Sequence, residues 1–473
     1  MSILPNPAIL HSLQRGSAPE GISVIKVIDA IMGKGKTTFL IDRIKHIDSE
    51  DQRKRWETAG EHVSTKFLVV VPLLSEVDRF TESLPNLNFK NPQPIEGRKL
   101  HHLKTLISEG QNVVTTHALF RMLDRDIYAK LKAEKYVLII DEVLDAVEMY
   151  AGLTGPDRQH LFDRRMVSID PVSKRLVWNH EDHGDYVGKF EDIKGLCDTG
   201  SLVMVNDAVL LWEFPSEFLR CFREVWVATY MLFGSPFHSY LMAEGFHLDM
   251  LTVNGGRLVS WLEGSHEEHL KRQLRGLITI YEGSMNDIGK EAVKDHPLSG
   301  GWYKRSSSTV LARLKASTEN FFKKVAQSPS HLNGWTTWKD YKKVLRGDRY
   351  SRNSSTPDKS FGFIPTNAKA TNDYRRVASV AYLVNVFYNP LIKSYFESMD
   401  VPVYEDLYAL SQMVQWIWRS RIREKEPINV FVPNERMRGL LKRWLDAGST
   451  IELVNEIDPR NHFFTEMILP TAA

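Results

Sequence analysis

Residues 22–38 read ISVIKVIDAIMGKGKTT, and this stretch decides the fold of the first part of the chain. The apolar run that ends at Asp29 predicts a buried β-strand. Residues 30–37 fit the phosphate-loop pattern, with Ala in place of its first Gly. Small residues at such a turn let backbone N–H groups surround a polyphosphate at the start of a helix. A chance glycine-rich turn between a strand and a helix is the alternative interpretation.

The loop residues have separate expected tasks. Lys36 is expected to meet the β and γ phosphates of a nucleotide, and the Thr37 hydroxyl is expected to bind Mg²⁺. The predicted nucleotide contacts of the loop are Gly33, Lys34, Gly35, Lys36, Thr37 and Thr38.

Three more apolar runs follow the loop, and polar segments compatible with helices separate them. They read KFLVVVPLL from residue 66, NVVTTHAL from residue 112 and YVLIIDEV from residue 136. Runs that are apolar at nearly every position indicate strands covered on both faces, as in parallel sheets. The sequence therefore predicts an α/β domain with a parallel sheet of at least four strands.

Two carboxylates, Asp141 and Glu142, end the last of these runs. Open α/β sheets bind their ligands at the carboxyl ends of the strands. Asp141 is suited to hold Mg²⁺ through water, and Glu142 is suited to polarise the water that attacks a γ phosphate. Taken alone, such a pair also fits the N-cap of a following helix. Together with the loop, it favours nucleotide hydrolysis.

The rest of the chain predicts an insertion and a second domain. Residues 150–222 read as short hairpins closed at Asp170-Pro171 and Asn206-Asp207. The strand pattern returns at EVWVATYMLFG, GLITIYEG and INVFVP, which begin at residues 224, 276 and 428. We therefore predict a first α/β domain over residues 1–265 and a second over residues 266–473. Within the second, we expect a buried helix over residues 377–392 and another helix from Gln415 to Arg423.

Composition limits the class of protein. Among 473 residues, 42% are hydrophobic and 25% are charged, which argues against a disordered, collagen-like or membrane-spanning chain. Lys and Arg number 61 against 59 Asp and Glu, so the net charge of +2 indicates no partner by itself. Two cysteines are too few for a disulfide framework. The start MSILPNPAIL has no basic leader, so we expect a cytoplasmic protein, in the host cytoplasm if the chain is viral.

Positive charge is concentrated in residues 301–380, where 16 Lys and Arg face 5 Asp and Glu. This balance predicts an anionic partner. The aromatic residues of the stretch are of a kind that stacks on nucleic-acid bases, but a solvated basic face over a core of aromatics fits equally well. They are Trp302, Tyr303, Phe321, Phe322, Trp335, Trp338, Tyr341 and Tyr350.

The order of these motifs resembles that of superfamily 2 helicases, the DEAD/DEAH-box-like motors with two RecA-like domains. Residues 141–144, DEVL, stand where that family has its DEAD or DEAH box. Residues 69–79 and 112–119 resemble its strand-end contacts to a nucleic-acid backbone, and residues 227–230 resemble the Ser-Ala-Thr motif that couples hydrolysis to strand movement. Residues 368–375 and 415–423 resemble the fifth and sixth motifs. The sequence of residues 370–390 and 415–423 is most similar to helicase-type proteins of tailed bacteriophages.

The sixth motif carries the expected cross-domain contact. A guanidinium from the second domain can stabilise charge on a γ phosphate bound to the first. Arg419 and Arg423 are four residues apart, so a helix would present both on one face, and we predict that they form the arginine-finger pair. The chain differs from Gln-x-x-Gly-Arg-x-x-Arg by Trp418 in place of Gly and by a last Arg one place later. A basic helix face exposed to water is the alternative.

The resemblance implies two RecA-like domains in tandem, with a β-hairpin-rich insertion in the first. It implies a nucleic-acid-dependent ATPase that uses ATP and Mg²⁺ to move along or unwind its partner. The catalytic set would be Lys36, Asp141, Glu142, Arg419 and Arg423, with Gln415 at the nucleotide and with Thr37 and Asp141 at the metal. The expected partners are single-stranded DNA or a single-strand/duplex junction, and replication or recombination proteins, but no membrane.

Two other functions fit the same motifs. A viral DNA-packaging ATPase also joins a phosphate loop to a strand-end acidic pair, but its nuclease needs clustered carboxylates for two metals. A nucleic-acid clamp or remodelling scaffold could use ATP to close on a strand without unwinding it.

Overall fold

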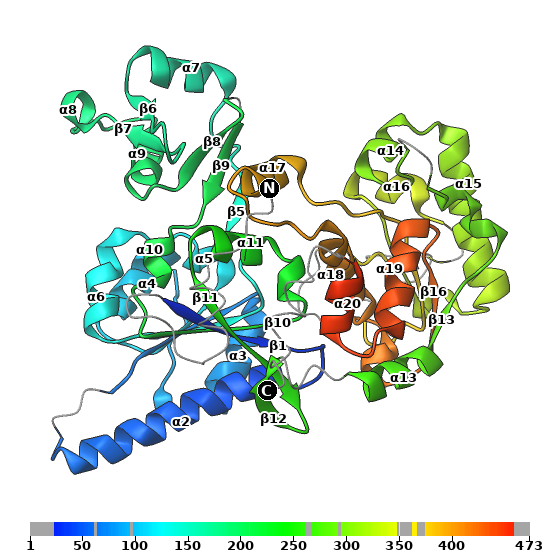
Figure 1. The fold of residues 1–473 in the computed structure, drawn as a ribbon, viewed down its shortest axis with the longest axis horizontal. Helices are drawn as coiled ribbons and strands as arrows, with labels where there is room; N and C mark the ends of the chain where they lie inside the picture. The colour runs from blue at the N-terminus through cyan, green and yellow to red at the C-terminus, as the bar shows by residue number, and fades with distance from the viewer. Residues whose placement is uncertain are drawn as a thin grey trace, which may run out of the picture.

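The structure, a computed structural model, describes residues 23–60, 64–94, 98–207, 209–261, 267–291, 295–347, 350, 362–366 and 374–457. These residues form two α/β domains that lie side by side, and a smaller insertion projects from the first domain (Figure 1). The predicted fold class, two RecA-like domains in tandem with an insertion that contains hairpins, is confirmed.

The first domain is built on a seven-stranded sheet with the order β12-β11-β1-β10-β4-β2-β3. Every neighbouring pair is parallel except β11 with β12. The strands are β1 (Val24–Asp29), β2 (Phe67–Val71), β3 (Val113–Thr116), β4 (Val137–Asp141), β10 (Glu224–Thr229), β11 (His247–Asn254) and β12 (Arg257–Ser260). Every residue of β2 and β4 is buried, as expected for strands that are covered on both faces.

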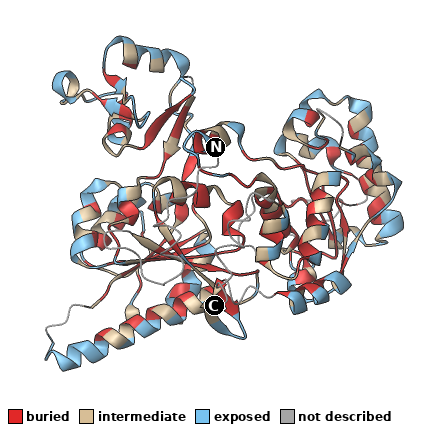
Figure 2. Ribbon diagram, in the orientation of Figure 1, coloured by how far each residue is buried: buried red, intermediate tan, exposed pale blue. Residues whose placement is uncertain are grey.

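Two hydrophobic clusters cover the two faces of this sheet. Successive residues of β4 alternate between them: Leu138 and Ile140 join one cluster, whereas Val137 and Ile139 join the other. Figure 2 shows the central strands of the sheet mostly in red, whereas α2 (Lys36–Glu57), which lies below the sheet in this view, is largely exposed on its outer side. The other helices are α3 (Leu74–Ser83), α4 (Lys99–Ser108), α5 (His117–Phe120), α6 (Tyr128–Ala133), α10 (Ser216–Leu219) and α11 (Pro236–Ala243).

The insertion follows β4 and contains both predicted hairpins. The strands β6 (Val167–Ile169) and β7 (Leu176–Trp178) pair antiparallel, and so do β8 (Leu202–Val205) and β9 (Val209–Glu213). Asn206 and Asp207, at the second turn, have φ of 51° and 52°, the left-handed values of a tight hairpin turn. The remaining elements are β5 (Val147–Met149), α7 (Gly155–Asp163), α8 (His180–His183) and α9 (Glu191–Asp198).

The second domain has a four-stranded parallel sheet with the order β13-β16-β15-β14. Its strands are β13 (Ile278–Ile280), β14 (Asn333–Thr336), β15 (Ser379–Tyr382) and β16 (Ile428–Phe431). Its helices are α13 (Glu268–Leu277), α14 (Gly300–Arg305), α15 (Ser308–Asn320), α16 (Lys342–Leu345), α17 (Pro390–Glu397), α18 (Glu405–Ile417), α19 (Glu435–Asp446) and α20 (Thr450–Ile457).

The predicted buried helix over residues 377–392 is wrong. Its first part is the strand β15, which lies between β14 and β16 and is buried along its whole length. The residues between β15 and α17 are mostly buried but belong to neither helix nor strand. A strand covered on both faces needs no charged residue, so the absence of charge that suggested a helix fits the strand equally well.

A segment of the second half of the chain is packed into the first domain. We call residues 388–403 the clasp. It includes α17, and its buried side chains belong to the same hydrophobic cluster as β1, β2 and β4. The helix α17 contacts both β5 and α11, and Figure 1 shows it beside the base of the insertion. The clasp therefore holds the second half of the chain to the core of the first domain.

The predicted boundary at residue 265 lies outside the described residues, between β12 and α13. It stays a prediction. Among the residues that the structure describes, no helix is both long and apolar enough to cross a membrane.

Candidate active site between the two domains

The turn between β1 and α2 has the backbone of a phosphate-binding loop. Gly33 and Gly35 have φ of 80° and 83°, in the left-handed region that glycine adopts without a steric penalty. Gly35 is the N-cap of α2, and the first turn of this described helix has neither a side-chain cap nor an acidic residue. The first N–H groups of α2 and the positive end of its dipole are therefore available to an anion.

Three predicted residues meet at the base of the loop. Lys36 is buried, and its Nζ donates to the carbonyl oxygen of Ala30 at 2.7 Å. The Thr37 hydroxyl donates to Oδ2 of Asp141 at 3.1 Å, although 104 residues separate the two. Lys34 is half-buried and Thr38 is exposed, and neither lines the cavity described below.

The Thr37 hydroxyl and the Asp141 carboxylate suit a hard divalent cation. Both offer oxygen, the ligand atom that Mg²⁺ prefers. Burial raises the pKa of Asp141 to about 6, and the charge of Glu142 also raises it, whereas the hydrogen bond from Thr37 and the charge of Lys36 lower it. A cation next to Asp141 would relieve the cost of burying this charge. Within the described ranges, no three His, Cys, Asp or Glu side chains form a group that could hold a metal by themselves.

Glu142 is held in an uncommon backbone conformation. Its φ is 71°, and its N–H donates to the carbonyl oxygen of Ala228 at 2.8 Å. Its side chain accepts a long hydrogen bond of 3.5 Å from the Thr229 hydroxyl. The alternative role of the acidic pair as a helix N-cap is wrong, because β5 is the next element after β4.

The helix predicted from Gln415 to Arg423 is also only partly correct. The helix α18 ends at Ile417, and a 3₁₀ turn, η8 (Arg421–Glu424), begins after Ser420, whose side chain accepts from the backbone N–H of Ile422. A serine hydroxyl that caps a new turn competes with continuation of the old helix. Arg419 and Arg423 therefore do not share a helix face.

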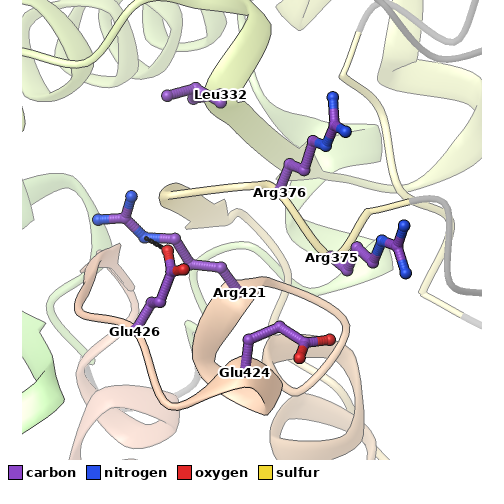
Figure 3. A pocket seen from close by; sticks show the side chains of 6 residues that line it. All are labelled: Leu332, Arg375, Arg376, Arg421, Glu424 and Glu426. Atoms are coloured by element: carbon purple, nitrogen blue, oxygen red, sulfur yellow. Dashed lines mark ion pairs between the residues drawn. The ribbon is translucent and has the colours of Figure 1, made fainter.

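The two arginines nevertheless reach the same cavity, and Arg421 does not. Burial lowers the pKa of Arg419 to about 10, and the negative charge of Glu142 opposes this shift. Arg423 is exposed and lines the cavity with it. Arg421 turns away: its Nε donates to the carbonyl oxygen of Pro427 at 2.6 Å. Figure 3 shows it at a separate depression of about 400 Å³ that Arg375 and Arg376 also line.

The cavity lies between the domains and has a volume of about 700 Å³. The first domain contributes Gly33 of the loop, Glu142 and Thr229, among others. The predicted residues that line it from the second domain are Gln415, Arg419 and Arg423. Lys36, Thr37 and Asp141 do not line the cavity, but their neighbours Gly33 and Glu142 do. Residues from both ends of the chain are thus brought to one cleft.

Two residues next to the phosphate loop have no task that the sequence predicted. The Trp418 ring lies against the loop, since a Cβ on Gly33 would be 3.5 Å from its Cζ2 atom. Asp29 is buried at the end of β1 and accepts 2.9 Å hydrogen bonds from the N–H groups of Met231 and Leu232. Each had a signal in the sequence: Trp418 occupies a glycine position of the sixth motif, and Asp29 is a carboxylate at a strand end.

A second cavity, of about 500 Å³, lies at the carboxyl ends of β2 and β3. It joins the two segments that were predicted to contact a nucleic-acid backbone, residues 69–79 and 112–119. The first supplies Pro72, Leu73, Leu74 and Ser75, and the second supplies Thr115, Thr116, Ala118 and Leu119. Lys99 of α4 adds a cation.

The interpretation that the aromatics of residues 301–380 stack on bases is wrong for most of them. Trp302, Tyr303, Phe321, Phe322, Trp335 and Tyr350 are buried in one cluster of the second domain, and Trp338 and Tyr341 pack against it. The positive side chains do face outward. We call the exposed ones the α14–α16 cations: Lys304, Arg305, Arg313, Lys323, Lys324, Lys339, Lys343 and Arg346. Of the segment matched to the fifth motif, residues 368–373 lie outside the described residues.

Comparisons with known proteins match most of the chain. The YonV C-terminal Rossmann-like domain matches residues 272–445, and the YonV middle domain matches residues 147–212, from β5 almost to the end of β9. The SPbeta prophage-derived uncharacterized protein YonV of Bacillus subtilis (strain 168) is 33% identical over 434 residues, which cover 89% of this chain and 98% of that protein.

The solved structures with a similar fold share less sequence identity with this chain than YonV does. One titled XPD_Helicase is 12% identical, with a TM-score of 0.47, and covers 93% of this chain and 98% of its own. The structure of S. tokodaii Xpd4 is 10% identical, with a TM-score of 0.42 and the same two shares.

Proposed function

The chain belongs to the YonV family, and from that premise we propose that it is an ATP-dependent nucleic-acid translocase or helicase. ATP and Mg²⁺ bind in the cleft between the domains, and a nucleic acid binds at the carboxyl edge of the first sheet. Hydrolysis alternates closure and opening of the cleft. The observation that carries the proposal is the cavity that Gly33 and Glu142 share with Arg419.

Each side chain has one task in the proposed reaction. Lys36 leaves the Ala30 carbonyl, which it contacts at 2.7 Å, and binds the β and γ phosphates. Thr37 and Asp141 hold Mg²⁺, which neutralises phosphate charge when it is bound. Glu142 orients and polarises the attacking water. Arg419 stabilises the charge that develops on the γ phosphate, and Arg423 and Gln415 orient the nucleotide from the second domain.

The nucleic-acid partner is proposed from the second cavity and from charge. The cavity at the ends of β2 and β3 offers backbone groups, hydroxyls and Lys99, which suit phosphate contacts. The α14–α16 cations add positive charge on the other domain. We propose single-stranded DNA or a single-strand/duplex junction as the nucleic-acid partner. We also propose that the chain interacts with replication or recombination proteins in the host cytoplasm. The domains divide at residue 265 in this proposal.

A nucleic-acid clamp without unwinding activity is the second candidate. The clasp favours it, because six of its side chains are buried in the core of the first domain and limit how far the domains can separate. These are Tyr388, Ile392, Tyr395, Phe396, Val401 and Val403. A strand-displacement assay on tailed duplexes separates the candidates: hydrolysis with tight binding but without displacement favours the clamp.

Steady-state ATP hydrolysis tests the proposal. The parent chain, Lys36→Ala and Glu142→Gln are compared with single-stranded DNA, duplex DNA, RNA and no nucleic acid. The parent should be stimulated by at least one nucleic acid, and both variants should lose about a hundredfold or more of the rate. Lys45→Ala, an exposed lysine of α2, is the matched control and should behave as the parent. An unstimulated parent, or variants with the parent's rate, would contradict the proposal.

A further inference from the structure

His117 connects the nucleic-acid cavity to the acidic pair. It is the first residue of α5, and residues on both sides of it, Thr116 and Ala118, line the cavity at the ends of β2 and β3. Its own side chain is buried, with 6% of its surface exposed. Its Nε2 donates to the carbonyl oxygen of Asp141 at 3.0 Å. The two residues that flank His117 thus line the cavity, while the side chain of His117 contacts Asp141.

The contact passes over an intervening strand. The sheet order β4-β2-β3 places β2 between the strand that precedes His117 and the strand that ends at Asp141. The helix α5 contacts the end of β2, which brings the imidazole across to β4. A nucleic acid that orders the loops after β2 and β3 would therefore act on the support of this imidazole.

The hydrogen bond from His117 holds one side of a single peptide unit. The carbonyl oxygen of Asp141 and the N–H of Glu142 belong to the same planar peptide group. His117 donates to that oxygen, and the N–H donates to Ala228 at 2.8 Å, so the peptide is fixed from both sides. Ala228 directly precedes Thr229, whose hydroxyl reaches the Glu142 carboxylate.

Glu142 needs such fixation because its backbone is strained. A φ of 71° is costly for a residue with a Cβ, and such conformations persist only where surrounding contacts enforce them. Without the bond from His117, the peptide before Glu142 keeps only the bond from its N–H to Ala228, so the strained backbone and the carboxylate that follows it are held less firmly.

We propose that His117 is a positioning residue that couples nucleic-acid binding to the orientation of Glu142. This inference rests on the proposed function, because it requires hydrolysis that a nucleic acid stimulates. His117 does not contact the nucleotide. When a nucleic acid binds in the cavity and fixes the residues around His117, the hydrogen bond from His117 fixes the peptide between Asp141 and Glu142.

The test compares His117→Ala and His117→Gln with the parent chain in ATP hydrolysis, with and without single-stranded DNA. The alanine variant should lower the ratio of stimulated to unstimulated kcat by about tenfold, the rate equivalent of removing one hydrogen bond. The KM for ATP and the DNA concentration at half-stimulation should stay close to those of the parent. The glutamine variant should recover most of the ratio, because its amide can donate to the same carbonyl.

Control variants separate coupling from binding and from folding. His101→Ala, an exposed histidine of α4, should keep the parent's ratio and melting temperature. Lys99→Ala, in the cavity, should raise the half-stimulating DNA concentration instead of lowering the maximal stimulated rate. The inference is overturned if His117→Ala keeps the parent's ratio, if its half-stimulating concentration rises in proportion to the loss, or if His117→Gln falls as far as the alanine variant. A parent chain that hydrolyses no ATP overturns the proposed function itself, and His117 with it.

Discussion

Asp29 is a buried carboxyl group directly before the phosphate loop. Burial raises its pKa to about 7, although the N–H groups of Leu232 and Met231 and the charge of Lys36 lower it. The folded state therefore keeps a proton that the unfolded chain releases at its ordinary pKa of 3.8. Because the folded state binds more protons across this window, the free energy of unfolding should fall as the pH rises from about 4 to about 7.

Asp29→Asn should remove that fall. Asparagine keeps an acceptor oxygen for one of the two N–H groups but does not titrate. The parent should lose on the order of 2 to 4 kcal/mol across the window relative to the variant. Urea unfolding of both chains at several pH values measures the difference. Parallel pH profiles would show that Asp29 is not the titrating group.

That Lys36, Thr37 and Asp141 lie together could be predicted from the sequence, whereas contacts that depend on how elements pack could not. Lys36, Thr37, Asp141 and Glu142 stand in patterns that specify their chemistry, and three of the four meet at the base of the loop. The hydrogen bond of His117 to Asp141 depends on how α5 packs over β2, which no local pattern encodes. The sequence around His117, TTHAL, fits equally well a histidine that contacts a backbone phosphate.

Among the elements, the turn after α18 decides which arginines line the interdomain cavity. The helix ends before Arg419, so helical spacing does not place the three arginines of this segment. Arg419→Ala should lower the kcat of ATP hydrolysis by about a thousandfold, as expected for an arginine finger, with a small change in KM. Arg421→Ala, on the far side of the turn, is the matched control and should stay within about twofold of the parent. Equal losses in the two variants would contradict the assigned orientations.

The clasp makes a testable contribution to stability. The Tyr395 hydroxyl of α17 donates to Oε2 of Glu213 at 2.7 Å, and Glu213 is fully buried and also pairs with Arg175. Tyr395→Phe leaves this carboxylate short of a donor, which should cost about 1 to 3 kcal/mol in denaturant unfolding.

Tyr128→Phe is the matched control for the clasp. It removes a buried hydroxyl that packs against the same hydrophobic cluster and has no hydrogen-bond partner among the described residues. Its free energy of unfolding should change by less than about 0.5 kcal/mol. Similar losses in the two variants would show that the Tyr395 bond adds nothing beyond the packing of the ring.

At the scale of the whole molecule, the two mainly parallel sheets could be predicted because most of their strands are apolar runs in the sequence. The packing of the clasp on the first domain could not be predicted. Residues 377–392 contain no charged side chain, and such a sequence fits one buried helix as well as a segment that crosses from one domain to the other. The sequence also did not predict whether the basic residues of α14–α16 or their aromatic neighbours face outward. Their aromatic neighbours form the core, so the charges remain at the surface.

The α14–α16 cations should appear in the salt dependence of nucleic-acid binding. Lys323→Glu with Lys324→Glu should weaken DNA binding and lower the slope of log K against log salt by about one for each lysine that neutralised a phosphate. Fluorescence anisotropy at several salt concentrations gives the slope. The same number of charge reversals on α2, at Lys45 and Arg53, is the control. An unchanged slope in the Lys323 and Lys324 variant would show that these two lysines do not contact the phosphates of the bound DNA.

The central claim is that both domains hold one nucleotide in the cleft between them. A crystal structure of the chain with Mg²⁺ and a non-hydrolysable ATP analogue tests it most directly. We expect the γ phosphate between Lys36 and Arg419, with Thr37 and Asp141 at the metal. An analogue bound elsewhere, or a γ phosphate that only the first domain contacts, would contradict the claim.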